Sequence, residues 1–344
     1  MWLFRQRKGE AVVHAKEKKN SFRSSTEFYL IIFLGISLLF LGLFARDFYS
    51  INNMMSVLNA FSYILISAIG MNMIILTSNI DVSTGALISV VCLVLAAVGK
   101  TGAPFGVLLL VAMIVGALLS TINGLFITKM KIPAIVATLA TTQIFQGVLP
   151  LVVEGSIYDL PASFTWLAFE AKIFGIIPAS ALLCLIVTIA ALVFMKYSRF
   201  SRKIYAIGNN AEGARLAGIS VEKTVVFTYT IAGILFGITS VIIATAGQRV
   251  TTTMGTGIEM TLIAAVVLGG TSTAGGSGRI GGTILGALIL SIISPAINYL
   301  GISPNWSDAV KGVIIIVSVI LSGARFIKKK RVLSLPEKGN AGGM

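Results

Sequence analysis

Long apolar stretches without charged residues recur along the whole of this chain. Four of them cover residues 28–44, 105–122, 182–195 and 313–321. A helix needs about 20 such residues to cross the hydrocarbon core of a bilayer. Only 12% of the residues are charged, whereas soluble domains carry about 25%. The stretches are continuous rather than alternating, which favours helices over membrane strands. We therefore predict an all-α, polytopic transmembrane bundle.

The apolar stretches predict about ten spans, with eight as the lower bound. The basic residues between them fall after the even-numbered spans, which is the cytoplasmic side by the positive-inside rule. We expect a basic cytoplasmic tail over 1–25, a transmembrane domain over 26–330 and a cytoplasmic C-terminal tail over 331–344. The predicted spans are 28–44, 55–77, 83–99, 104–127, 133–153, 173–195, 225–246, 258–271, 280–300 and 309–325.

The formal net charge of +14 does not indicate a nucleic-acid partner, because the basic residues sit in short clusters between apolar spans. The lipid bilayer accounts for them. On the opposite side, residues 154–172 combine acidic side chains with Trp166, which is typical of an outer loop. This loop either caps the bundle or meets an extracytoplasmic partner.

Two polar or small-residue interruptions, 78–85 and 269–278, break the helical pattern. Corresponding interruptions in two halves are typical of transporters built from internal repeats, in which broken helices meet near the substrate. The alternative is a pair of ordinary cytoplasmic loops. Within the first interruption, Asp81 either caps the following helix or contacts the substrate.

Polar side chains embedded among apolar ones are candidates for a substrate pathway. Thr138, Thr142 and Gln146 repeat every four residues and therefore share a helix face. Such a face suits a neutral, hydroxyl-bearing substrate, and hydrogen bonding between helices is the alternative. The pathway candidates are Asn72, Asn79, Asp81, Ser83, Thr138, Thr142, Gln146 and Asn298.

Several kinds of chemistry are not indicated by the residues present. A proton-driven carrier would need a chain of buried Asp, Glu or His, and none is present in the sequence. There is no G-x-x-x-x-G-K-[ST] loop to hold nucleotide phosphates. Cys92 and Cys184 lie in apolar stretches without metal-ligand spacing. We expect no catalytic residue, metal or cofactor, and an energy source outside the chain.

Small residues spaced by four predict close helix packing in lipid. They occur in three places: Gly116, Ser120 and Gly124; Gly233 and Gly237; and Gly278, Gly282 and Gly286.

The central loop, residues 196–223, contains a predicted short helix. An asparagine start, helix-forming residues and a stopping glycine lie between Asn210 and Ile219. A short helix outside the membrane can dock into a groove on another protein. The alternative is a simple surface helix.

Five stretches together resemble the permease subunits of bacterial ABC importers of the ribose, arabinose and autoinducer-2 type. The resemblance implies a non-catalytic subunit of the bacterial cytoplasmic membrane, working with a second permease (a second copy or a sister chain), ATP-binding subunits and an extracytoplasmic solute-binding protein. Within that group, the sequences of these stretches are most similar to autoinducer-2 permeases. The rival hypothesis is a secondary carrier or facilitator without ATP coupling. The matching stretches are 79–85, 131–139, 205–210, 255–260 and 264–272.

The resemblance also implies a role for the short helix of the central loop. Glu212-Gly213-Ala214 followed by Gly218 is similar to the E-A-A-x-x-x-G pattern of importer permeases, with Gly213 in place of the first alanine. In that family this helix couples the permease to the ATP-binding subunit. The implied coupling residues are Asn210, Glu212, Ala214, Arg215 and Gly218.

Overall fold

The computed structural model describes residues 26–316 apart from 154, 158–159, 170, 174, 176, 248, 304 and 315. The apolar helices are α2 (Thr26–Phe44), α3 (Ile51–Leu76), α4 (Thr84–Gly99), α5 (Phe105–Lys129), α6 (Ala134–Val152), α8 (Ala179–Tyr197), α11 (Val221–Thr245), α12 (Ile258–Leu268) and α13 (Ile280–Tyr299). Short helices are η1 (Arg46–Tyr49), α7 (Ala162–Phe169), α9 (Arg199–Asn209) and α10 (Ala211–Leu216). Two small antiparallel pairs complete the described part: β1 (Ser156–Ile157) with β4 (Val250–Thr251), and β2 (Lys172–Ile173) with β3 (Ile177–Pro178).

The all-α prediction is confirmed. Among the described residues, seven helices are long and apolar enough to cross a membrane, and α4 and α12 are shorter apolar helices. These nine helices correspond to nine of the ten predicted spans. The sixth begins at Ala179 rather than 173, because the β2–β3 hairpin occupies the residues before it. The tenth prediction, 309–325, extends outside the described residues, and both predicted tails lie outside them.

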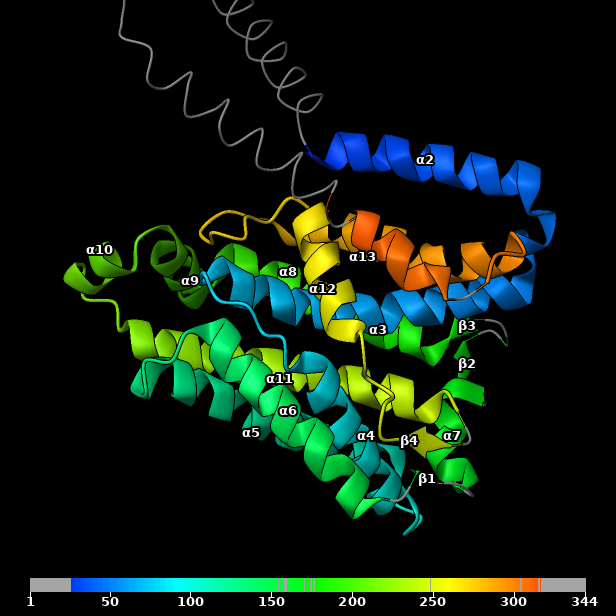
Figure 1. Cartoon of the computed structure of the whole chain (residues 1–344), viewed down its shortest axis with the longest axis horizontal. Coiled ribbons are helices and arrows are strands. Elements are labelled where there is room, and N and C mark those ends of the chain that lie inside the picture. Colours follow the sequence, from blue (N-terminus) through cyan, green and yellow to red (C-terminus); the bar gives the residue numbers. More distant parts are fainter. Residues whose placement is uncertain are drawn as a thin grey trace, which may run out of the picture.

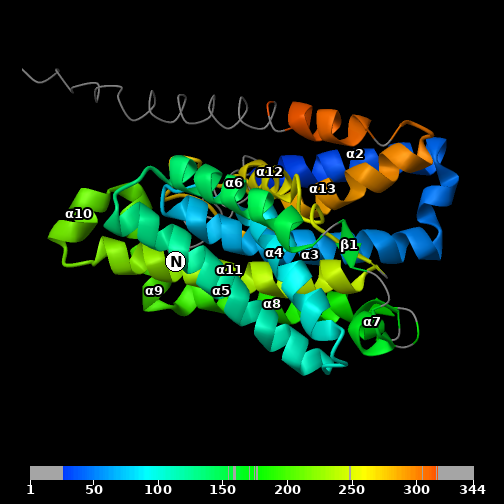
Figure 2. The same cartoon turned by 60° about the horizontal axis from the view of Figure 1, so that its bottom comes forward.

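Helices α3 and α11 form the centre of the bundle. The most apolar 18-residue windows of α3 and α11 are 72% and 67% buried, against 11–22% for α2, α5, α6 and α8. Figure 1 shows α2 at the edge of the bundle beside α13, with α9 and α10 at one end and the strands with α7 at the other. The turned view in Figure 2 keeps α10 and α7 at opposite ends of the long axis. The peripheral helices therefore face lipid or another subunit.

The predicted small-residue contacts are confirmed. A Cβ added to Gly116 of α5 would overlap the carbonyl oxygen of Gly233 in α11, and a Cβ on Gly233 would overlap the carbonyl oxygen of Gly116. A Cβ on Gly282 of α13 would likewise overlap the carbonyl oxygen of Gly269, which follows α12. Close backbone approach replaces side-chain interdigitation at these two seams.

Two membrane crossings are broken. Residues 77–83 are non-helical and lead into α4, which confirms the predicted break at 78–85. The second predicted interruption, 269–278, is also non-helical, and it matches the alternative of an ordinary loop. That segment is the turn between α12 and α13, and its Ala274 accepts a hydrogen bond from Ser78 Oγ (2.8 Å) at the α9 end.

The second broken crossing instead lies before α12, in the turns of residues 252–257. The 11 residues of α12 rise about 16 Å, roughly half of a bilayer core. The chain therefore covers the rest of this crossing without a helix. We call residues 252–257 the re-entrant segment.

Substituting Gly116 by alanine tests the α5–α11 seam. Because the added Cβ overlaps backbone atoms that cannot rotate away, we expect a loss of about 1–3 kcal/mol in the free energy of unfolding. The measurement is thermal unfolding of the purified protein in detergent. The matched control is Gly106→Ala on the same helix, where the Cβ meets open space. Equal unfolding midpoints for the two variants would contradict the seam.

Candidate functional site

Asp81 braces the break between α3 and α4. Its Oδ1 accepts hydrogen bonds from the backbone N–H of Ser83 (2.8 Å) and from Ser83 Oγ (2.6 Å). Asn123 of α5 donates through Nδ2 to Ser83 Oγ (2.7 Å). All three side chains are fully buried. The carboxylate therefore points into the subunit and fastens the non-helical segment to α5.

The polar face of α6 begins at this break. Thr138 is buried, and its Oγ1 accepts a hydrogen bond from the backbone N–H of Val82 (3.2 Å). One turn further, Thr142 is half-buried and donates to the carbonyl oxygen of Thr138 (2.8 Å). Gln146, another turn along, is exposed. Thr138, Thr142 and Gln146 therefore follow one face of α6 from the buried break to the exposed surface. We call these three residues the α6 line.

Two other pathway candidates lie apart from this line. Asn72 is fully buried and donates to Thr271 Oγ1 (3.1 Å) and to Thr283 Oγ1, so it joins α3 to α13. Asn298 is exposed near the end of α13. For Asn72 the geometry matches hydrogen bonding between helices rather than an open pathway.

Asn79 occupies a third position, on the α10 side of the break. Its Nδ2 donates to the carbonyl oxygen of Thr77 (3.1 Å) and to Thr77 Oγ1 (2.9 Å). It also lines a cavity of about 520 Å³ together with Lys131, Arg215 and Glu222. Asn79 therefore shares a cavity with Arg215, one of the predicted coupling residues.

The first turns of α4 and α12 meet inside the bundle, a contact that the sequence did not indicate. A Cβ on Gly85 would overlap Glu259 Oε2 and the carbonyl oxygen of Gly255. The backbone N–H of Gly255 donates to Ser89 Oγ of α4 (2.9 Å). Glycines at the starts of two short apolar helices were the available signal, but a single sequence does not say that the two glycines face each other.

The predicted short helix in the central loop is confirmed as α10, with a cap at each end. Asn210 Oδ1 accepts a hydrogen bond from the backbone N–H of Gly213 (2.9 Å). At the other end Gly218 has a φ of +79°, and the backbone N–H of Ile219 donates to the carbonyl oxygen of Ala214 (3.0 Å). The helix covers Ala211–Leu216, slightly less than the predicted stretch.

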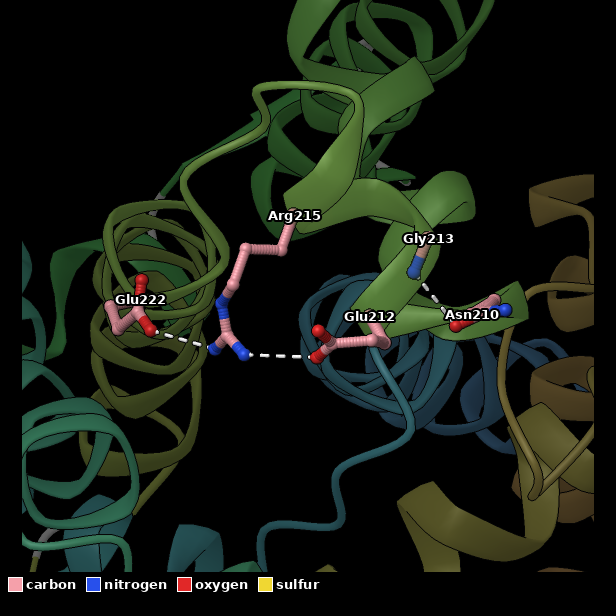
Figure 3. A network of polar contacts seen from close by, with 5 residues as sticks. All are labelled: Asn210, Glu212, Gly213, Arg215 and Glu222. Atoms are coloured by element: carbon pink, nitrogen blue, oxygen red, sulfur yellow. Dashed lines mark hydrogen bonds and ion pairs between the residues drawn. The ribbon is translucent and has the colours of Figure 1, made fainter.

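Arg215 links α10 to α11. Its two terminal nitrogens contact Glu212 Oε2 (3.2 Å) and Glu222 Oε1 (2.9 Å), as Figure 3 shows. Ala214 is buried against the rest of the protein, whereas Leu216 is 83% exposed. Glu222 and Leu216 were not among the predicted coupling residues, since each gains its position only from the folding of α10 back onto α11.

Helix α9 connects this unit to the break between α3 and α4. A Cβ on Gly208 would overlap the carbonyl oxygen of Leu76, so α9 and the end of α3 are in direct contact. Three hydrogen bonds extend the connection: Tyr205 Oη donates to the carbonyl oxygen of Gly278 (2.9 Å), Asn209 Nδ2 to that of Gly276 (3.2 Å), and Ser78 Oγ to that of Gly208 (3.2 Å).

Asp81→Ala distinguishes bracing from direct contact with a solute. Removal of the carboxylate leaves two buried donors of Ser83 without this acceptor, so we expect a loss of about 1–3 kcal/mol in the free energy of unfolding. Thermal unfolding in detergent measures it. Asn79→Ala is the control, because Asn79 is only half-buried and bonds within its own turn. Unchanged stability with lost transport would instead support solute contact.

Comparisons with known proteins agree on one family. Residues 53–319 match the family model described as "Branched-chain amino acid transport system / permease component". The ribose import permease protein RbsC of Escherichia coli (strain K12) is 34% identical over 81% of this chain and 88% of its own. The probable ABC transporter permease protein YphD of the same organism is 36% identical over 90% and 94% of the two chains. The autoinducer 2 import system permease protein LsrC of Yersinia enterocolitica is 32% identical over 82% and 78%.

No solved structure matches. The family match covers the broken crossings, the α6 line and the α9–α10 unit together. The chain therefore belongs to this family of bacterial transport permeases, and it is the multi-pass membrane permease component of an ABC importer.

Proposed function

We propose that this permease carries a neutral, sugar-like solute into the bacterial cytoplasm, with the α9–α10 end facing the cytoplasm. Basic residues lie in the last turns of α5 (Lys129) and α8 (Lys196) and within α9 itself (Arg202), as the positive-inside rule requires of a cytoplasmic end. Helix α2 begins at the same end of the bundle. This orientation would place the N-terminal tail in the cytoplasm, as predicted.

We propose that α10 receives the movement of an ATP-binding subunit. The observation that carries this proposal is the geometry of α10: a capped helix held by Arg215 to both Glu212 and Glu222, presenting Leu216 outward. An exposed leucine beside a fixed guanidinium suits a groove with an apolar floor and an acidic or polar rim. The Arg215 pairs make the helix move together with α11.

The opposite end suits the proposed solute-binding protein. The described parts of the predicted outer loop, including β1 and α7, lie at that end, and β1 pairs with β4 just before the re-entrant segment. Contact with a binding protein there would act directly on the entrance to the second broken crossing. A second permease subunit, either a copy or a sister chain, would cover the exposed polar end of the α6 line.

Two observations support the proposed solute: the solutes named for the relatives, and the absence of charge on the α6 line. The relatives named above are ribose and autoinducer 2 permeases, whereas the family description names branched-chain amino acids. The half-buried hydroxyl of Thr142 and the exposed amide of Gln146 can exchange hydrogen bonds with the hydroxyls of a sugar, whereas Thr138 is buried at the break. We propose ribose as the first candidate and autoinducer 2 as the second.

Replacing Leu216 by aspartate tests coupling through α10. A charge at the centre of an apolar docking contact should lower ATP-driven solute uptake by at least tenfold in vesicles containing the whole importer, because association with the ATP-binding subunit weakens. Co-purification of that subunit measures association directly. Ile51→Asp is the control, since Ile51 is 69% exposed and begins α3 at the far end. Equal uptake by the wild-type and Leu216→Asp importers would rule out the docking role.

Uptake by cells that depend on this permease tests the substrate class. We expect labelled ribose to accumulate, and unlabelled ribose to compete at least tenfold better than leucine, because the α6 line carries no charged group to pair with an amino acid. Autoinducer 2 is the second competitor. Accumulation of leucine in place of either sugar-like solute would contradict the proposal.

A further inference from the structure

The re-entrant segment exposes irregular backbone inside the membrane. Residues 252–257 form consecutive turns, and Thr253, Thr256 and Gly257 are exposed. The segment ends where α12 begins, and Figure 1 shows this point within the bundle, between the α9–α10 end and the β1–β4 end. The exposed turns therefore lie near the middle of the bilayer rather than at its surface.

Hydrocarbon cannot cover this surface. Backbone N–H and C=O groups that are not paired within a helix cost several kcal/mol each in lipid, so irregular backbone at this depth lines water or is covered by protein. The inner side of the segment supports the aqueous alternative. There Thr256 and Thr261 border a cavity of about 130 Å³, whose other polar lining residues are Tyr63, Ser291, Ser294, Asp308 and Lys311.

Glu259 lies at the junction of α4 and α12. Two described acidic residues lie at the broken crossings, Asp81 and Glu259. Asp81 is fully enclosed and bonded to Ser83, whereas Glu259 is only half-buried. Its Oε2 lies against the first turn of α4 at Gly85, and the adjacent first turn of α12 carries the same positive backbone potential. The positive potential of the two first turns stabilises the Glu259 carboxylate. Because Glu259 is only half-buried, it also remains within reach of water.

We propose that Glu259, together with Thr253 and Thr256, forms a contact site for the hydroxyl groups of the transported solute. The inference rests on the proposed function, and it names the chemical class as a neutral polyhydroxylated molecule. A carboxylate accepts hydrogen bonds from two neighbouring hydroxyls at once, and the threonine hydroxyls both donate and accept. Anionic solutes such as phosphorylated sugars are repelled by the same carboxylate. The site therefore contributes selection by charge in the middle of the crossing.

Thiol labelling tests whether water reaches the site. The described chain has two cysteines, Cys92 and Cys184, and both are buried, so a third thiol is read out alone. With a charged, membrane-impermeant thiol reagent in both compartments, we expect Glu259→Cys and Thr253→Cys to react at least tenfold faster than Leu118→Cys. Leu118 is 60% exposed on the apolar surface of α5 and serves as the lipid-facing control. A Glu259→Cys variant that reacts no faster than Leu118→Cys overturns the proposal.

Transport in vesicles tests the contact itself. The complete importer carrying Glu259→Gln should move at least tenfold less solute per ATP hydrolysed, while ATP hydrolysis and the thermal unfolding midpoint stay at wild-type values. Asp47→Asn, an exposed acid in η1, is the matched control and should behave as wild type. Uptake by Glu259→Gln within twofold of wild type overturns the contact site, and so does a loss explained by lower stability. Failure of the wild-type importer to take up any sugar with ATP would overturn the proposed function instead.

Discussion

The whole bundle is arranged around the need to satisfy non-helical backbone inside a membrane. Lipid offers no hydrogen bonds, so each amide of the segment 77–83 needs a partner within the protein. Asp81 accepts from the N–H of Ser83 and Thr138 accepts from the N–H of Val82. Asn123 then holds Ser83 from α5. The break is therefore held in place by α5 and α6, and it in turn holds these two helices together.

These hydrogen bonds make the segment 77–83 rigid, and the α9–α10 unit lies next to it. Arg215 holds α10 to α11, and α9 contacts the end of α3 through Gly208 and Leu76. The backbone N–H of Gly276 donates to the carbonyl oxygen of Leu76 (3.0 Å), which adds the α12–α13 turn to the same contact. Under the proposed coupling role of α10, a movement of α10 would reach the segment 77–83 and the α12–α13 turn through the Arg215 ion pairs and the backbone contacts of α9.

Sequence alone predicted the features that depend on local pattern. Apolar length predicted the helices, residue spacing marked Gly116 and Gly233 as packing positions, and a cap residue with a stopping glycine predicted α10. Features that depend on which segments meet in space were missed. The small residues of 269–278 correctly predicted a non-helical segment, but the break before α12 was missed, because only the shortness of α12 reveals it. Asn72 was grouped with a pathway because polarity does not reveal whether a side chain faces a neighbouring helix.

The junction of α4 and α12 differs from the other contacts in a way that suits movement. Gly85 and Gly255 meet backbone to backbone, so no interlocked side chains resist sliding or separation of the two short helices. One hydrogen bond crosses this junction, from the backbone N–H of Gly255 to Ser89 Oγ (2.9 Å), whereas side-chain hydrogen bonds of Asn123, Asn72 and Asn209 join the surrounding elements. If α10 receives the movement of an ATP-binding subunit, as proposed above, we expect the bundle to yield first at the contact with the fewest directional interactions. Glu259 lies at that contact, where a small displacement changes what its carboxylate faces.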